Sequence, residues 1–181
     1  MINIGMITIN RIAENSVEGI LNGFEICQQQ GATKFILDLR DNGGGLVSTG
    51  IEISQLFLEE GTIIHRSEKG TDTSIVEVEN PGLLRDLSLV VFINENTASA
   101  AEMIAGTLKA HQRATLIGHR SFGKTSIQYV FDLQDGSSIH LTSSTWWIPG
   151  VDFPLEPDIP LADGAENSDW CQMAIEILSR D

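Results

Sequence analysis

Residues 89–110 read LVVFINENTASAAEMIAGTLKA and join a continuous apolar run to a helix-forming stretch. Residues 89–93 are wholly apolar, which is typical of a strand buried inside a parallel sheet. Small residues dominate the second half of the stretch, and Met103, Ile104 and Leu108 give a helix one face to bury. A buried strand that leads directly into a helix predicts an α/β fold with parallel pairing at the centre of the sheet.

The same alternation of strands and helices extends on both sides of this stretch. Turn residues separate the segments, and the glycines at 43–45 form a loop after the apolar run that ends at Leu39. Further strands are expected at 5–9, 35–39, 62–67, 73–78, 114–117, 127–133, 138–142 and 144–148, with a polar turn at 68–71 and helices at 15–30, 47–59 and 168–178.

The length and composition favour one globular domain. The chain has 181 residues, of which 41% are hydrophobic and 20% charged, enough to bury a sizeable core. We expect a single domain over 1–181, in which 149–165 is an extended, proline-rich connection and 166–181 is a C-terminal helix.

The charge and the cysteine count exclude several classes of protein. With 11 basic and 25 acidic residues the net charge is -14, which repels nucleic acid and anionic lipid, so no nucleic-acid partner is expected. Only Cys27 and Cys171 are present, too few for a zinc ribbon or a disulfide framework, and both are expected to be buried structural thiols. The sequence contains no metal-binding motif, so neither a metal nor a cofactor is expected.

The N-terminal residues 1–7 lack the basic leader and long apolar run of a signal peptide or membrane helix. These residues therefore contain no recognisable targeting signal. Because residues 5–9 already resemble a strand, we expect the chain to come from a longer precursor, whose export signal would place it outside the cytoplasm.

Residues 118–125, GHRSFGKT, match the phosphate-binding pattern G-x-x-x-x-G-K-[ST]. Such a loop requires a helix directly after it, because the helix N-terminus holds the phosphates. Residues 126–131, SIQYVF, are instead rich in β-branched and aromatic side chains. The context therefore disfavours a nucleotide site, which stays open as the least favoured alternative, and Lys124 needs another role.

Ser99 lies between the strand at 89–93 and the helix that follows, so it is expected at or near a helix N-terminus. Free backbone N–H groups there can stabilise an oxyanion, which suits a nucleophile. The alternative is structural, because Ser99-x-x-Glu102 before an apolar run is also a capping box. The segment by itself favours the capping role.

Four segments together resemble the core of the carboxyl-terminal processing, or tail-specific, peptidases. They are TASAAEMIAGTLKAHQRATLIG at 97–118, SFGKTSIQYVFDLQDGSSIHLTS at 121–143, FILDLRDNGGGLVSTGIEISQLFL at 35–58 and, more weakly, PLEPDIPL at 154–161. The resemblance covers most of the chain and implies an α/β crotonase-like core of the Clp protease/crotonase type, with a mixed sheet and flanking helices.

The resemblance also implies a serine endopeptidase that cleaves protein or peptide substrates near their C-termini through an acyl-enzyme. Ser99 matches the nucleophile and Lys124 the general base, with Glu102 and Gln128 at the positions that orient the lysine. This implied set shifts the balance from the capping role of Ser99 to a Ser-Lys dyad.

The implied oxyanion hole consists of the backbone N–H of Ala100 and one from the glycine loop, with Gly44 and Gly45 as candidates. A lysine acts as a base only when it is partly neutral, which requires burial or a nearby positive charge. We expect the neighbouring Phe122 and Ile127 to supply that burial.

Other assignments remain as alternatives. The four histidines are expected to be structural or on the surface, since no G-x-S-x-G motif is present. Trp146 and Trp147 are expected to pack in the core, with lining of a groove as the alternative. Photoreceptor retinoid-binding proteins are similar to this domain and suggest a non-catalytic module that binds an apolar ligand. Typical relatives carry a PDZ domain for substrate capture, which this sequence does not show, so recruitment and oligomeric state stay open.

Overall fold

The computed structural model describes residues 3–68 and 73–180, so the expected turn at 68–71 lies largely outside the described residues. The described ranges contain nine strands and four helices. They are β1 Ile4–Thr8, α1 Ser16–Gln29, β2 Lys34–Asp38, α2 Val47–Leu56, β3 Thr62–Glu68, β4 Ser74–Glu77, β5 Ser88–Ile93, α3 Ala100–Ala110, β6 Thr115–Gly118, β7 Ser126–Asp132, β8 Ser138–Trp147, β9 Ile159–Pro160 and α4 Asn167–Leu178.

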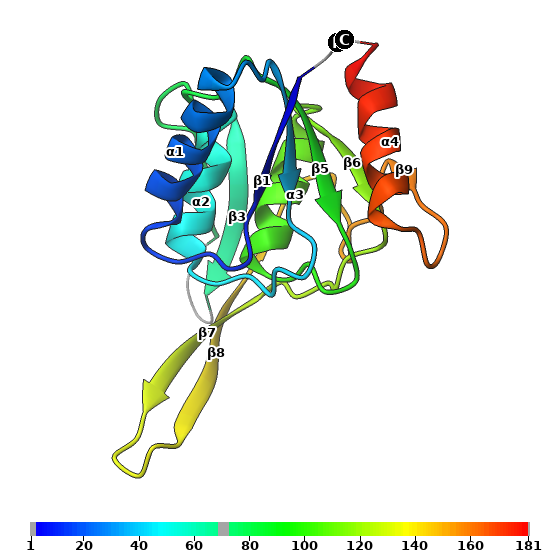
Figure 1. The fold of residues 1–181 in the computed structure, drawn as a ribbon. Coiled ribbons are helices and arrows are strands. Elements are labelled where there is room, and N and C mark those ends of the chain that lie inside the picture. The colour runs from blue at the N-terminus through cyan, green and yellow to red at the C-terminus, as the bar shows by residue number, and fades with distance from the viewer. Residues whose placement is uncertain (1–2, 69–72, 181) are drawn as a thin grey trace.

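The described strands form two sheets. The first is parallel throughout, in the order β1-β2-β5-β6-β9, and the second is antiparallel, in the order β4-β3-β8-β7. The helix α4 covers one face of the parallel sheet, while α1, α2 and α3 lie on its other face (Figure 1). The expected mixed α/β architecture is therefore observed, divided between two sheets.

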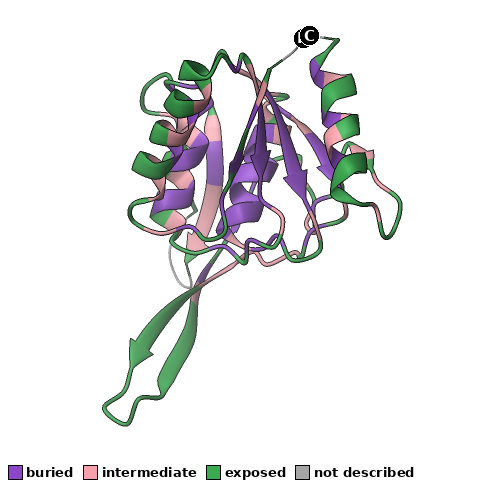
Figure 2. Cartoon of the chain, in the orientation of Figure 1, coloured by how far each residue is buried: buried purple, intermediate pink, exposed green. Residues whose placement is uncertain are grey.

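The apolar run at 88–93 becomes the central strand β5, flanked by β2 and β6. Its residues from Leu89 onward are all buried, because helices cover both faces of the sheet. The helix α3 is buried over most of its length, against α2 and the sheets rather than solvent (Figure 2). Its many small residues permit this close approach on several sides.

The strands β7 and β8 form a hairpin that projects from the body of the molecule and is exposed over its outer part (Figures 1 and 2). Its turn is closed by hydrogen bonds from Leu133 N–H to Ser137 O and from Gly136 N–H to Leu133 O, with Gly136 at φ 84°. The separate strands expected at 138–142 and 144–148 are wrong, because β8 runs continuously from Ser138 to Trp147. The irregularity is a bulge within β8: Ile127 pairs with Ser144 and Gln128 with Thr142, which leaves Ser143 as an extra residue.

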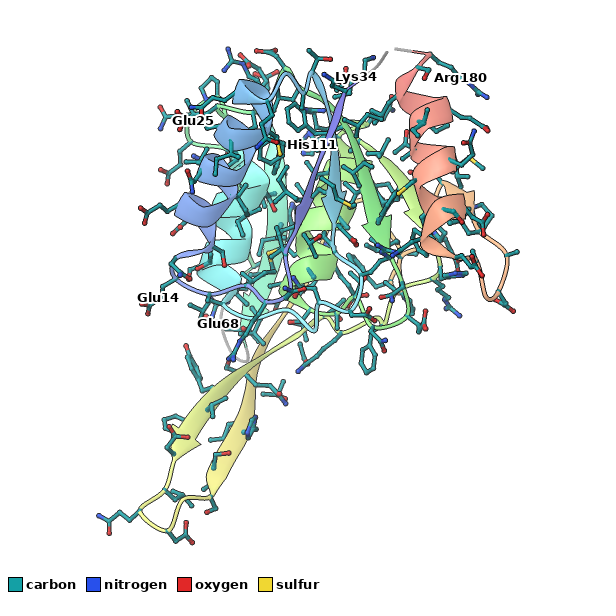
Figure 3. The ribbon with its side chains drawn as sticks, in the orientation of Figure 1. Glu14, Glu25, Lys34, Glu68, His111 and Arg180 are labelled. Carbon is teal, nitrogen blue, oxygen red and sulfur yellow. The ribbon has the colours of Figure 1, made fainter. Side chains whose placement is uncertain are left out.

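Parallel pairing brings three loops to the same edge of the first sheet. The strands β2, β5 and β6 are neighbours with the same direction, so the loops 39–46, 94–99 and 119–125 that follow them all begin at their carboxyl ends. The hairpin departs from this end of the body, where Glu14 and Glu68 lie, whereas Lys34 and Arg180 are at the opposite end (Figure 3). Within the described ranges, no helix is long and apolar enough to cross a membrane.

Candidate active site

Ser99 is the N-cap residue of α3, and its backbone adopts φ 56° and ψ -120°. Non-glycine residues rarely occupy this region, and where they do, the surrounding structure must hold them there. The N–H of Ala98 donates to the carbonyl of Asn42 at 2.9 Å, and that of Ser99 to Glu102 Oε2 at 2.8 Å. The expected capping-box pair is therefore present, and it fixes the half-buried serine at the start of the helix.

The carboxylate of Glu102 is fully buried and accepts four hydrogen bonds. Its Oε1 accepts from the hydroxyl of Ser121 at 2.5 Å and the N–H of Gly123 at 2.6 Å. Its Oε2 accepts from the N–H groups of Ser99 and Lys124, both at 2.8 Å. One side chain thus joins the first turn of α3 to the loop 119–125, and it holds Lys124 by its backbone rather than by its ammonium group.

The ammonium group of Lys124 donates to Gln128 Oε1 at 3.4 Å, and Gln128 Nε2 donates to the hydroxyl of Thr142 at 3.4 Å. Lys124 is half-buried. The expectation that Phe122 buries it is wrong, because Phe122 is 63% exposed, although Ile127 packs against the core. Among the described residues, Lys124 and Ser99 line one groove without a hydrogen bond between them.

The glycine loop after β2 lies directly beside the nucleophile candidate. Gly44 has φ 94°, and a Cβ there would stand 2.9 Å from the Cβ of Ser99 and 3.0 Å from the nitrogen of Ala100. Only a glycine permits this approach. The N–H of Gly44 donates to Asn42 Oδ1 at 2.8 Å, whereas those of Gly45 and Ala100 have no acceptor within the described part of the chain.

A second set of hydrogen bonds ties the glycine loop to the loop that carries Ser99. Asp41 Oδ1 accepts from the side-chain amides of Asn94 at 2.9 Å and Asn96 at 2.8 Å, and its N–H donates to Asn94 Oδ1 at 2.9 Å. These hydrogen bonds from Asn96 and Asn94 lower the pKa of Asp41 below its ordinary value. The side chain of Asn42, fully buried, also donates to the carbonyl of Ile9 at 2.6 Å.

An open groove of about 560 Å³ runs past Ser99 between the start of α2 and the base of the hairpin. Its basic lining residues are Arg66, Lys124 and His140, and no carboxylate of the described residues lines it. In a chain of net charge -14, this groove is therefore a local basic region. Ser99, Lys124, Gln128 and Gly45 all face it.

Other expectations have mixed outcomes. The strand expected after Lys124 is confirmed as β7, so the helix that the disfavoured phosphate-loop alternative requires does not follow it. Cys27 and Cys171 are half-buried rather than buried. Trp146 is buried as expected, while Trp147 remains 37% exposed.

Three of the histidines contact structural neighbours. His65 and His119 pack edge-on against tryptophans, and His111 bonds to the carbonyl of Thr62. His140 is exposed on the hairpin and lines the groove. Across residues 3–68 and 73–180, no group of three or more potential ligands could hold a metal ion.

A serine at a helix N-terminus, beside a close-packed glycine loop and across a groove from a lysine, is an arrangement suited to a serine hydrolase. The model of peptidase family S41 matches residues 3–161, and the chain belongs to this family. A carboxyl-terminal-processing protease from Synechocystis sp. is 39% identical over 148 residues, which cover 81% of this chain and 34% of that protein. Another, from Picosynechococcus sp., is 35% identical over 191 residues, covering 98% and 46%.

Solved structures agree with this assignment. The photosystem II D1 C-terminal processing protease matches with a TM-score of 0.77 and 28% identity over 94% of this chain and 45% of its own. The tricorn protease shares the fold at a TM-score of 0.62 and 20% identity, covering 98% and 18%. These matches confirm the family resemblance and the crotonase-like α/β core. The chain spans about a third to a half of the length of the curated relatives named above.

Sequence reasoning missed several residues that hold the site together. The side chain of Ser121 bonds to Glu102 of α3, that of Asn42 to the carbonyl of Ile9 after β1, and that of Asp41 to Asn94 after β5. Asn42 and Asp41 precede the glycines in the sequence, so the polar loop was visible, but nothing in it indicated which carbonyls and amides these side chains would reach. Ser121 lies inside the apparent phosphate-loop pattern, which assigns a role to Lys124 but none to Ser121.

Proposed function

We propose that this chain is the proteolytic core of a serine endopeptidase that cleaves protein or peptide substrates near their C-termini through a Ser99-Lys124 dyad. The observation that carries the proposal is the Glu102 carboxylate, which binds the backbone N–H groups of both Ser99 and Lys124 and so holds the two residues on one groove. Membership of peptidase family S41 supports the same reaction class.

In the proposed reaction, the Oγ of Ser99 attacks the substrate carbonyl carbon while the neutral amine of Lys124 takes the hydroxyl proton. The developing oxyanion accepts hydrogen bonds from the N–H groups of Ala100 and Gly45, since neither has a partner among the described residues. The C–N bond then breaks, and the leaving amine takes the proton from Lys124. Water, deprotonated by Lys124, then attacks the acyl carbon, the C–Oγ bond breaks, and Lys124 returns the proton to the Oγ of Ser99.

The lysine must turn from Gln128 toward Ser99 for the first proton transfer, because the structure shows its ammonium group bonded to Gln128. Such catalytic hydrogen bonds often tighten only when substrate is bound. Gln128 is then a positioning residue that holds the amine beside the groove between turnovers. The assignment of Gly44 to the oxyanion hole is less favoured than that of Gly45, because the N–H of Gly44 already donates to Asn42.

The test is turnover of an unstructured peptide by Ser99→Ala and Lys124→Ala, each of which should abolish cleavage while the far-ultraviolet circular dichroism stays unchanged. Lys34→Ala is the matched control, since Lys34 lies at the opposite end of the molecule from the hairpin (Figure 3). A serine-directed phosphonate should label Ser99. Undiminished cleavage by either variant contradicts the dyad, and tight binding of an apolar ligand without labelling would favour a binding module.

A further inference from the structure

The helix α4 begins beside the loops of the candidate active site. Its first residue, Asn167, accepts a hydrogen bond through Oδ1 from Nη1 of Arg40 at 2.8 Å. Arg40 is the second residue of the loop that follows β2. From there the helix runs along β5 and β6 toward the opposite end of the body (Figure 1). The first turn of α4 therefore lies at the loop end of the molecule.

Trp170, in this first turn, is 4% exposed and lies against the ends of three strands. Its indole stands edge-on to Phe92 of β5 and to His119, which follows β6, with ring centroids 5.2 Å and 5.5 Å apart. The guanidinium carbon of Arg40 lies 4.6 Å from the centroid of the indole. A Cβ at Gly118, the last residue of β6, would collide with the same ring. One side chain therefore contacts residues at or directly after the carboxyl ends of β2, β5 and β6.

The loops that begin at these three strand ends carry the candidate active site. They hold the oxyanion-hole candidate Gly45, the nucleophile candidate Ser99 and the candidate base Lys124, in the order of their strands. Arg40 and His119 lie where the first and the third of these loops leave the sheet, and both contact the indole. The position of the indole therefore sets the starting points of the loop with the oxyanion hole and of the loop with the base.

Hydrogen bonds fix Arg40 against the indole. Asp38, 5% exposed, accepts from Nε of Arg40 at 2.9 Å and from its Nη2 at 2.6 Å, and Asp38 Oδ1 also accepts from the backbone N–H of Arg40 at 3.1 Å. A two-point contact between guanidinium and carboxylate is geometrically specific, and a planar guanidinium stacks on aromatic rings as an ammonium group does not. The start of the glycine loop is thus tied to β2 by Asp38 and to α4 by Asn167 and Trp170.

The two ends of α4 bury different kinds of side chain. Its later turns cover the sheet with Ala174 and Leu178, both 0% exposed and both in the same apolar cluster as Trp170. Aliphatic side chains are sufficient for that burial. Trp170 requires in addition a glycine at Gly118 and an arginine at its ring, which burial alone does not demand. The difference indicates a role for the indole beyond covering the sheet.

We propose that Trp170 is a positioning residue of the peptidase reaction, whose indole holds the first and third loops where the N–H of Gly45 and the amine of Lys124 can both reach Ser99. The inference rests on the proposed function, because the reaction defines which loop positions are productive. A displacement of about 1 Å in such groups can lower a rate about a hundredfold. Loss of the indole should therefore lower kcat and leave KM nearly unchanged, since Trp170 does not line the groove.

Trp170→Leu tests the proposal, with Leu178→Ala as its matched control. Both variants remove buried atoms from the same cluster and should lower the Tm, but the last turn of α4 lies away from the loops (Figure 1). At a temperature where circular dichroism shows both variants folded, kcat should fall about tenfold or more in Trp170→Leu and stay within about twofold in Leu178→Ala. Trp170→Phe, which keeps an aromatic ring beside Arg40, should recover most of the lost kcat.

A second pair of variants leaves the interior of α4 unaltered, so it stands even where Trp170→Leu does not fold. Arg40→Lys keeps the charge but loses the planar group at the indole, and kcat should fall about threefold or more. Arg85→Lys is the control, because Arg85 pairs with Glu59 and its guanidinium lies over no ring of the described residues. Its kcat should equal that of the unaltered protein.

Equal kcat in Trp170→Leu and Leu178→Ala, or a rise in KM with kcat unchanged, would overturn the positioning role. Equal kcat in Arg40→Lys and Arg85→Lys would overturn it as well. In each of these cases the unaltered protein still cleaves peptide, and its Ser99 still reacts with a serine-directed phosphonate. Absence of both cleavage and labelling in the unaltered protein would instead contradict the proposed function on which the inference rests.

Discussion

Glu102 offers the sharpest test of how the site is held together. In Glu102→Gln an amide NH₂ replaces one carboxylate oxygen, and each oxygen accepts at least one backbone N–H. In the better of the two orientations the NH₂ takes the place of Oε1, where the hydroxyl of Ser121 can turn to accept but the N–H of Gly123 cannot. At least one half-buried backbone N–H is therefore left opposite another donor.

The expected magnitude follows from this count. Hydrogen bonds to a charged group contribute about 1.5–3 kcal/mol and neutral ones about 1 kcal/mol. Loss of one bond and weakening of the other three should lower the free energy of unfolding by about 3–4 kcal/mol, or the Tm by roughly 10 °C. Because Glu102 positions both Ser99 and Lys124, kcat should also fall about a hundredfold.

Urea denaturation followed by fluorescence of the buried Trp146 and Trp170 measures the stability, and peptide cleavage measures kcat. Glu95→Gln is the matched control, because it removes the same charge from an exposed position on the loop before α3. If Glu102→Gln and Glu95→Gln have the same free energy of unfolding, the hydrogen bonds to the Glu102 carboxylate do not stabilise the fold, and the reasoning is refuted. Loss of stability with unchanged kcat would refute its positioning role.

Two further outcomes are expected. Gly44→Ala should lower cleavage at least about tenfold, because the new Cβ meets the backbone carbonyl of Ala98 at 2.7 Å and the backbone there has φ 94°. Gly43→Ala is the control and should lower cleavage far less, because a Cβ at Gly43 has nothing within 4 Å. An equal loss of cleavage in the two variants would contradict the packing argument. Since the folded pKa of Asp41 is lowered, its contribution to stability is present above the unfolded value of about 3.9 and is lost as the pH falls through the folded value. Asp41→Asn should therefore flatten the decline of Tm below about pH 4, and an unchanged profile in a thermal melt series would refute this.

The apolar patterns determined most of the fold from the sequence. The run ending at Ile93 is wholly apolar, which predicts a strand covered on both faces, and the small residues after it predict a closely packed helix; β5 and α3 are buried accordingly. The strand expected after Lys124 was equally secure, because β-branched and aromatic residues disfavour the helix that a phosphate loop needs. Family resemblance identified the residues of the candidate site, which periodicity alone could not.

Tertiary structure alone decided how those residues are connected. Ser99 looked like a helix cap and is one, yet the Glu102 carboxylate that completes the cap also binds the backbone of Lys124, 22 positions further along the chain. The sequence could not show this, because hydrogen bonds between loops depend on which strand ends become neighbours in the sheet. Nor could it show that β8 continues through its irregular segment, or that β7 keeps a free edge, since an edge exists only once the order of strands is set.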